Sequence, residues 1–446
     1  MTEEVVEVKV SGGGRESQST PRSPFASHRF MNGTTPLASP MRKAIGYFGE
    51  VGRFTKLDDW LPITESRKGN AYYAAFHVLC SGIGFQALLL PCAFTTLRWT
   101  WGIVCLSMAF AWQLYTLWLL IQLHESDSGV RHSRYLRLAM AAFGEKMGKL
   151  LALFPIMYLS GGTCVTLIMM GGGTMKIFFH MVCGAPCRCP LTTIEWYLVF
   201  TCTAILLAQL PNLNSIAGVS LIGAITAVSY CALTWIVSVV KGRLDHVSYG
   251  SQREQSEVIM VFSAWNALGI IAFAFRGHNL VLEIQIPNGG TLDALHKYHE
   301  HDTTKLIIAL TSLLVIINCI SSFQIYAMPV FDNLEFRYTS KKNRPCPRWL
   351  RVAFRGFFGC LAFFIAVALP FLPYLAGLIG GVALPITLAY PCFMWIQIKR
   401  PQKFSTNWYL NWTLGVVGMI LSVLVVIGAI WSIVAQGIRI HFFNPQ

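Results

Sequence analysis

Charged residues are scarce in this chain of 446 amino acids. They make up 13% of the sequence, whereas soluble globular domains average about 25%. Hydrophobic residues make up 54%. So few charges cannot cover the surface of a soluble protein of this size. Apolar runs of about 20 residues recur along the chain, and each can cross the hydrocarbon core of a bilayer. The sequence therefore predicts an all-α polytopic membrane protein and argues against a large soluble helical protein.

Motifs of enzyme catalysis are also missing. The sequence contains no nucleophile elbow, no phosphate-binding loop and no zinc-protease helix. The net charge is +14, but no nucleic-acid-binding motif is present. The basic residues cluster between the apolar runs, where they orient membrane helices. His296, His299 and His301 have the spacing of metal ligands but lie in a polar segment without Cys. We expect no enzyme activity, no metal and no nucleic-acid partner.

The first 69 residues contain no span. Residues 11–43 are rich in Ser, Thr, Pro and Gly, and we expect residues 1–69 to form a disordered cytoplasmic tail without a cleaved signal peptide. Residues 70–446 are expected to form the transmembrane domain. The predicted spans are approximately 71–97, 101–123, 149–183, 194–210, 215–240, 258–284, 305–330, 350–372, 374–396 and 412–434.

Basic residues orient these spans, because short segments rich in Lys and Arg stay in the cytoplasm. The tail and the amphipathic segment 124–148 are basic, which places both inside. The segment 331–348 is also basic, yet ten alternating spans would place it outside. One further span between 285 and 304 would remove the conflict, but that stretch is too highly charged to cross a bilayer. We therefore predict that the chain lacks one helix that its second half requires.

Two predicted spans, 71–97 and 258–284, are polar at their centres. Interrupted helices in corresponding positions of two repeats offer free backbone groups to a substrate and its coupling ion. Close packing through small residues is the alternative for the first break. The candidate substrate-binding residues are Ser81, Gly82, Ile83, Gly84, Phe275, Arg276, Gly277 and Asn279.

Three ionisable residues in or after the second break are candidates for coupling or gating. Arg276 is costly inside a membrane and should contact substrate or ion, act in gating, or form a structural pair with Glu283. His278 could bind a proton near neutral pH or be a hydrogen-bonded structural residue. Glu283 is either an inner gate or proton relay, or a solvated helix end.

Polar patches on two other spans have two interpretations. The first patch covers residues 158–163, and the second contains Ser321, Ser322, Gln324 and Tyr326. Both could line the same cavity as the breaks, or they could form hydrogen bonds between helices.

Four stretches together form a specific pattern: WLPIT followed by GNA within residues 60–71, GFQAL at 84–88, QLPNLNS at 209–215 and AFAFRGHNLVLEIQ at 272–285. They resemble the lysine–histidine-transporter-like proteins of plants, which belong to the amino acid/auxin permease family. The resemblance extends over residues 36–446. It implies eleven spans, an inverted-repeat fold like that of the leucine transporter, a plasma-membrane location and symport of amino acids with H+ by alternating access. It implies no other cofactor.

The chain departs from this family directly after Gln285. The family has further residues there, including a full helix, whereas this chain passes to Ile286 and Pro287. This is the helix that the charge pattern also predicts to be missing. The alternatives are a non-transporting form that acts as a sensor or a dominant-negative partner, and a permease for auxin or another organic acid with Arg276 facing the carboxylate. The amino acid and the oligomeric state are not predicted.

Overall fold

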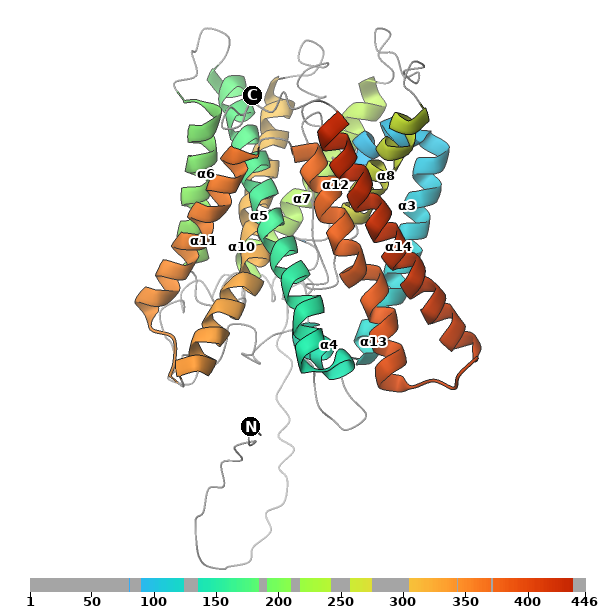
Figure 1. Ribbon diagram of the computed structural model, residues 1–446. Helices are drawn as coiled ribbons and strands as arrows, with labels where there is room; N and C mark the ends of the chain where they lie inside the picture. Colours follow the sequence, from blue (N-terminus) through green and yellow to red (C-terminus); the bar gives the residue numbers. More distant parts are fainter. Residues whose placement is uncertain are drawn as a thin grey trace, which may run out of the picture. The chain divides into compact units, whose positions relative to one another are not determined.

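A computed structural model describes residue 80 and residues 90–123, 135–183, 191–209, 217–241, 257–274, 305–342, 344–369 and 372–435. These ranges consist of helices and connections, without a strand (Figure 1). The helices are α3 (Leu90–Leu123), α4 (Tyr135–Phe143), α5 (Glu145–Cys183), α6 (Thr193–Ala208), α7 (Ala217–Lys241), α8 (Glu257–Ala274), α10 (Lys305–Lys342), α11 (Arg348–Ala368), α12 (Leu372–Leu384), η2 (Pro385–Ala389), α13 (Tyr390–Lys399) and α14 (Thr406–Ala435). The prediction of an all-α protein is confirmed.

Most of these helices have the length and the apolar composition of membrane spans. Within the described ranges, eight are long and apolar enough to cross a bilayer, and α6 is a shorter apolar helix. Large apolar side chains such as Trp118, Ile121 and Val423 are exposed on α3 and α14. In water such surfaces would drive association, whereas lipid tails are as apolar as the side chains themselves. The chain is thus a multi-pass membrane protein.

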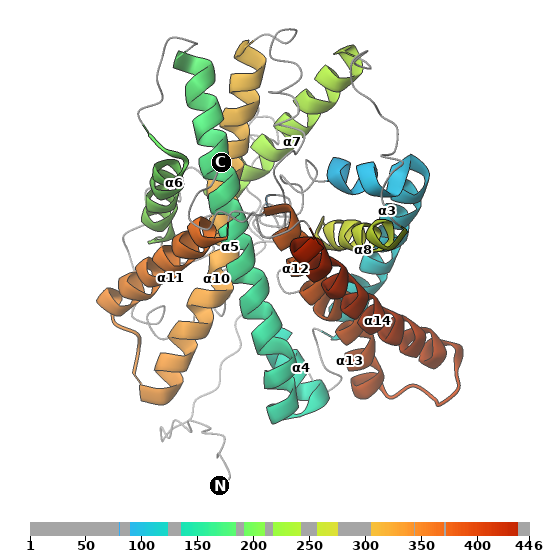
Figure 2. The ribbon, with the colours of Figure 1, turned by 45° about the horizontal axis from the view of Figure 1, so that its top comes forward.

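Helices α5 and α10 run antiparallel at the centre of the packing. Met181, near the end of α5, packs on Ile308, near the start of α10, and on Val237, near the end of α7. At the other end of α10, Glu335 contacts Arg355 of α11. The packing of α5 and α10 therefore determines which ends of their neighbouring helices lie together (Figure 2).

Helix α6 begins with a capping box that Thr192 and Glu195 form. The Thr192 hydroxyl accepts a hydrogen bond from the Glu195 amide, and the Glu195 carboxylate accepts one from the Thr192 amide. Two backbone amides that a helix start would leave without partners are thereby satisfied. Lys176 of α5 donates to the Thr193 hydroxyl over 2.9 Å. The start of α6 therefore lies beside the end of α5.

Helix α8, which precedes the second predicted break, packs very closely on α12. A side chain at Gly380 would collide with the carbonyl of Gly269, so the two backbones touch. Small residues allow such close approach of membrane helices. On another side of α8, Phe262 stacks on Trp431 of α14 with ring centroids 4.7 Å apart. Helix α8 is thus held rigidly up to the point where the candidate residues begin.

The beginnings of α5, α11 and α14 lie at one end of the described bundle (Figure 1). Helix α4 leads into α5 and packs on α13. The Tyr135 hydroxyl at its start donates to the Ile386 carbonyl of η2 over 2.8 Å. We call this end the basic end, because many exposed basic residues lie there. They include Arg137, Lys146, Lys149, Arg337, Lys341, Lys342, Arg344, Arg348, Arg400 and Lys403.

The directions of the helices agree with the orientation that the charge pattern predicts and disagree with ten alternating spans. Ten alternating spans would separate the segment 331–348 from the segment 124–148, but the described parts of both segments, residues 331–342, 344–348 and 135–148, lie at the basic end. Helices α8 and α10 both begin at the opposite end and therefore run in the same direction. Ten alternating spans do not allow this, because these two helices would be consecutive and would run in opposite directions. Residues 275–304, which connect them, lie outside the described ranges.

The helix that contains the predicted span 305–330 is longer than that span. It continues without interruption to Lys342 and includes Pro329. Beyond residue 330 it contains the acidic residues Asp332 and Glu335. Both are buried in the structure, and a partner on α11 removes the cost of burying the Glu335 charge.

Helix α3 includes the end of the first predicted span and all of the second. Arg98 interrupts it with φ 60° and ψ 170°. A positive φ is unusual for a residue with a side chain and marks a sharp local turn. Trp99 and Trp101 follow and are exposed, as aromatic residues at a membrane–water interface commonly are.

Candidate functional site

The ten residues predicted to bind substrate or couple it to an ion lie outside the described ranges. They are Ser81, Gly82, Ile83, Gly84, Phe275, Arg276, Gly277, His278, Asn279 and Glu283. The structure therefore leaves their geometry untested. Cys80, which directly precedes the first break, is described and is fully buried. Its surroundings show which helices lie beside the start of this break.

Helix α10 donates two side-chain hydrogen bonds to the main chain of Cys80. The Cys80 carbonyl accepts from Asn318 Nδ2 at 3.4 Å and from Ser322 Oγ at 3.3 Å. The Cys80 thiol also lies 3.8 Å from the Ser322 hydroxyl. Side chains that bind the backbone of another helix fix its position in a membrane, where no water can replace them. Asn318 and Ser322 therefore hold the chain directly before the first break.

Helix α7 completes this contact through Gly223. Its carbonyl accepts a second hydrogen bond from Asn318 Nδ2, at 3.0 Å. A Cβ at this position would collide with the Cys80 sulfur and come within 2.7 Å of the Ser321 Cβ. Only glycine fits where Cys80, α7 and α10 meet. We call Cys80, Gly223, Asn318 and Ser322 the Cys80 cluster.

Several polar atoms in and near this part of the bundle are buried without a hydrogen-bond partner among the described residues. They include the Asn318 side-chain oxygen, the Tyr230 hydroxyl, the Ser312 hydroxyl and the Ser160 hydroxyl. A buried polar group without a partner costs about 1–3 kcal/mol. Transporters tolerate such groups where water, an ion or a substrate can reach them. The Asn318 oxygen is an acceptor within the Cys80 cluster itself.

The structure divides the two predicted polar patches. Ser321 and Ser322 lie beside Cys80, as expected for a lining of the first break. Gln324 instead donates to the Ala204 carbonyl of α6 over 3.1 Å, which is an interhelical hydrogen bond. On α5, the Thr163 hydroxyl donates to its own helix at Leu159. The interhelical interpretation is confirmed for Gln324, and the lining of a cavity shared with the breaks stays a prediction.

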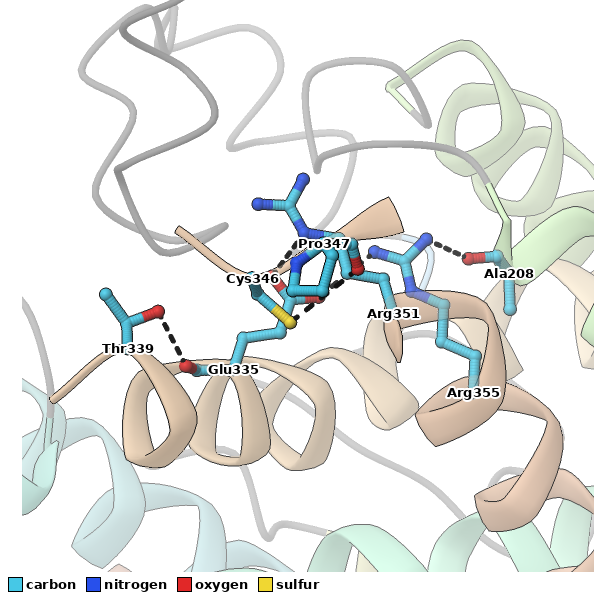
Figure 3. A network of polar contacts seen from close by, with 7 residues as sticks. All are labelled: Ala208, Glu335, Thr339, Cys346, Pro347, Arg351 and Arg355. Carbon is cyan, nitrogen blue, oxygen red and sulfur yellow. Dashed lines mark hydrogen bonds and ion pairs between the residues drawn. The ribbon is translucent and has the colours of Figure 1, made fainter. Parts of the chain in front are cut away.

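Sequence reasoning missed a buried ionic cluster at the basic end. Glu335 and Arg355 are each only 3% exposed. Arg355 lies 3.5 Å from one Glu335 oxygen, and Arg351 Nε lies 3.2 Å from the other (Figure 3). Arg355 was nevertheless detectable, because it lies within the predicted span 350–372, and an intramembrane Arg is a candidate by the same rule that selected Arg276.

Arg355 also ties the ionic cluster to α6. Its guanidinium donates to the Ala208 carbonyl over 2.7 Å, at the end of α6 (Figure 3). It also lies 5.4 Å from the centre of the Phe331 ring. The carbonyl end of a helix is negative, which favours a cation there. Three helices, α6, α10 and α11, are thereby joined at the basic end by one buried side chain.

Cys346 lies in the short connection beside this ionic cluster. Burial raises the pKa of its thiol, and the Glu335 carboxylate raises that pKa further. The thiol is therefore protonated at neutral pH and acts as a small apolar group that packs against the ionic cluster (Figure 3).

An apolar helical bundle that buries polar side chains between its helices is compatible with a membrane transporter. Residues 67–286 and 292–435 match the family described as "Transmembrane amino acid transporter protein". The chain belongs to this family, which is the amino acid/auxin permease family of the sequence resemblance.

Two relatives from Arabidopsis thaliana extend over nearly the whole chain. Lysine histidine transporter-like 8 is 51% identical over 478 residues, with 96% of this chain and 91% of the relative covered. Lysine histidine transporter-like 7 is 41% identical, with 89% and 92% covered. A solved substrate-bound, outward-open Na+-coupled sialic acid symporter matches with a TM-score of 0.45 and 10% identity, over 88% of this chain and 96% of its own.

The family match is interrupted at residues 287–291. The comparison with lysine histidine transporter-like 8 runs over 478 residues, although this chain has only 446. The relative therefore contains residues that this chain lacks. The interruption falls where the resemblance and the charge pattern predicted a missing helix.

Proposed function

We propose that this member of an amino acid transporter family is a proton-coupled amino acid symporter of the plasma membrane. Substrate binds at the breaks at residues 81–84 and 275–279, and the inverted-repeat fold supports alternating access. The observation that supports this best is the Cys80 cluster. It supplies a fixed anchor directly before the first break, where a zwitterionic substrate would meet free backbone groups.

The coupling residues in this proposal are His278 and Glu283. A His near neutral pH changes its charge with small changes in its surroundings, which suits the uptake and release of H+. Arg276 faces the substrate carboxylate. No other ion or cofactor takes part in the proposed cycle.

The test is uptake of radiolabelled amino acids by transport-deficient cells that express the full 446-residue chain, with surface expression measured in the same cells. We expect uptake to be faster at acidic than at neutral pH and to stop with a protonophore. Uptake that a protonophore leaves unchanged would exclude proton coupling. Stronger competition by unlabelled auxin or another organic acid than by amino acids would instead indicate an organic-acid permease.

A second candidate, a non-transporting sensor or dominant-negative partner, is favoured by the interrupted family match. A chain that lacks one helix of its second repeat lacks an element that alternating access would move. The test compares the native chain with a chimera that contains, between Gln285 and Asn288, the corresponding stretch of lysine histidine transporter-like 8. Uptake by the chimera alone, at equal surface expression, would establish this second candidate. Equal uptake by both would exclude it.

A further inference from the structure

We propose that η2 is a hinge within the membrane span that α12, η2 and α13 form together, and that the Tyr135 hydroxyl of α4 holds this hinge in one position. The five residues of η2, Pro385–Ala389, form a π-helical turn near the middle of this span, and all five are buried. Such a turn inside a longer helix is rare and is often found at functional sites. The span therefore departs from a regular helix where its two halves meet.

Two prolines remove hydrogen-bond donors from the centre of this span. Proline has no N–H, so the carbonyl one turn earlier loses the donor that a regular helix would supply. Pro385 does this to Gly381, four positions earlier. A π-helical turn pairs a carbonyl with an N–H five positions later, as Pro385 pairs with Tyr390, and Pro391 removes the donor at that spacing for Ile386. Both carbonyls therefore need partners from outside the backbone of the helix.

Side chains of two other helices supply these partners. The Ser422 hydroxyl of α14 donates to the Gly381 carbonyl over 2.8 Å. The Tyr135 hydroxyl of α4 donates to the Ile386 carbonyl, also over 2.8 Å. Side-chain donors of this kind are what makes proline tolerable within a membrane span. The first half of the span is thus attached to α14, and its π-helical centre is attached to α4.

The two halves of the span each have a neighbour that the other half lacks. The first half, α12, is in backbone contact with α8 through Gly380 and Gly269. The second half, α13, packs in one apolar cluster with α4 (Figure 1). Helices α5 and α14 lie along both halves. Because α8 directly precedes the second predicted break, bending at η2 would let α12 move with α8 while α13 stays beside α4 at the basic end.

The test is hydrogen–deuterium exchange, measured by mass spectrometry on the purified full-length chain in lipid nanodiscs. Tyr135→Phe removes the hydroxyl and keeps the ring. We expect the amides of residues 386–395 to exchange about tenfold faster than in the native chain, because the Ile386 carbonyl loses the Tyr135 donor and the hinge opens more often. The amides of α12 should exchange at the native rate.

Tyr390→Phe is the matched control. Tyr390 lies in the same apolar cluster, edge-on to Phe143, and its hydroxyl is not hydrogen-bonded to any residue that the structure describes. This variant removes the same atom from the hinge region without removing a hydrogen bond. We expect it to exchange like the native chain.

Pro391→Ala tests the mechanism from the other side. It returns an N–H at the position that π-helical spacing assigns to Ile386. Combined with Tyr135→Phe, it should bring the exchange of residues 386–395 back near the native rate. Alone, it should slow this exchange, because the hinge then has a donor of its own.

Three outcomes would overturn the proposal: unchanged exchange of residues 386–395 in Tyr135→Phe, an equal increase in Tyr390→Phe, or an equal increase in α12 and α13, which would indicate general destabilisation. Failure of Pro391→Ala to reverse the effect would overturn the assignment to the Ile386 carbonyl. Melting temperatures show whether each variant folds. If Tyr135→Phe does not fold, unchanged or faster exchange in Pro391→Ala alone would overturn the proposal. Because the measurement needs no substrate, failure of the proposed symport does not affect the result.

Discussion

At the residue scale, the buried ionic cluster has the largest energetic consequence. Glu335 holds the charges of Arg351 and Arg355 inside the protein, and Arg355 in turn holds the end of α6. Removing one partner of a buried ion pair leaves an uncompensated charge, which costs more than the pair itself contributes. The cluster is therefore a point at which a single substitution can separate three helices.

We predict that Glu335→Gln lowers the free energy of unfolding by about 3–5 kcal/mol, because it leaves the two arginines without their carboxylate. The measurement is thermal melting of the purified protein. Glu145→Gln is the control, because Glu145 also pairs with a basic residue, Lys149, but both side chains are exposed. A similar loss of stability in both variants would contradict the assigned role of the buried pair. Apolar replacement of both Glu335 and Arg355 should recover part of the loss.

A second residue-scale prediction concerns Asn318 in the Cys80 cluster. Asn318→Leu keeps the side-chain volume but removes both donors that hold Cys80 and Gly223. We expect a clear drop in amino acid uptake at equal surface expression, because the chain before the first break loses its anchor. The control is Ser321→Ala, whose hydroxyl donates to the Ile317 carbonyl of its own helix. If uptake falls only with Ser321→Ala, Asn318 does not position the break.

At the element scale, helix packing depends on a few close approaches. Helix α7 meets α10 and Cys80 through Gly223, and α8 meets α12 through Gly269 and Gly380. Bulky apolar residues are exposed on the outer sides of α7, α8 and α10. Membrane helices cannot be held by the hydrophobic effect alone, so backbone contact and side-chain hydrogen bonds determine where each helix lies.

We predict that Gly223→Ala destabilises the protein by about 1–3 kcal/mol, because the added methyl group overlaps Cys80 and approaches Ser321. The control is Gly173→Ala in α5, where a Cβ has no neighbour within 4 Å and alanine favours the helix. Melting temperatures of both variants are compared with that of the native chain. An unchanged melting temperature for Gly223→Ala would show that α7 can move away from Cys80 at little cost.

At the scale of the whole molecule, charge and topology agree once the helix directions are known. The segments around α4, the α10–α11 corner and the α13–α14 connection share one end. Positive charge in short connections keeps them in the cytoplasm. The helices after residue 304 therefore have the orientation expected for a chain that crosses the membrane once more than the ten predicted spans do.

This orientation predicts the side on which introduced cysteines are labelled. Arg344→Cys and Lys146→Cys should react with a membrane-impermeant maleimide only after the cells are permeabilised. Leu191→Cys, at the opposite end beside the start of α6, should react in intact cells. Each variant is compared with the native chain, which corrects for its own cysteines. Reaction of Arg344→Cys in intact cells would place the α10–α11 corner outside and contradict this orientation.

The sequence by itself determined the class of protein, the family and the conflict after residue 285. These depend on properties read along the chain: apolar length, the order of Lys and Arg, and motifs such as the run at 272–285. The tertiary structure decided what depends on distant residues. Asn318 reaches Cys80 across 238 positions and Arg355 reaches Ala208 across 147, and Glu335 of α10 finds its partners on α11. Sequence patterns do not report such pairings, because the cost of burying a polar or charged group depends on which partner the fold brings to it.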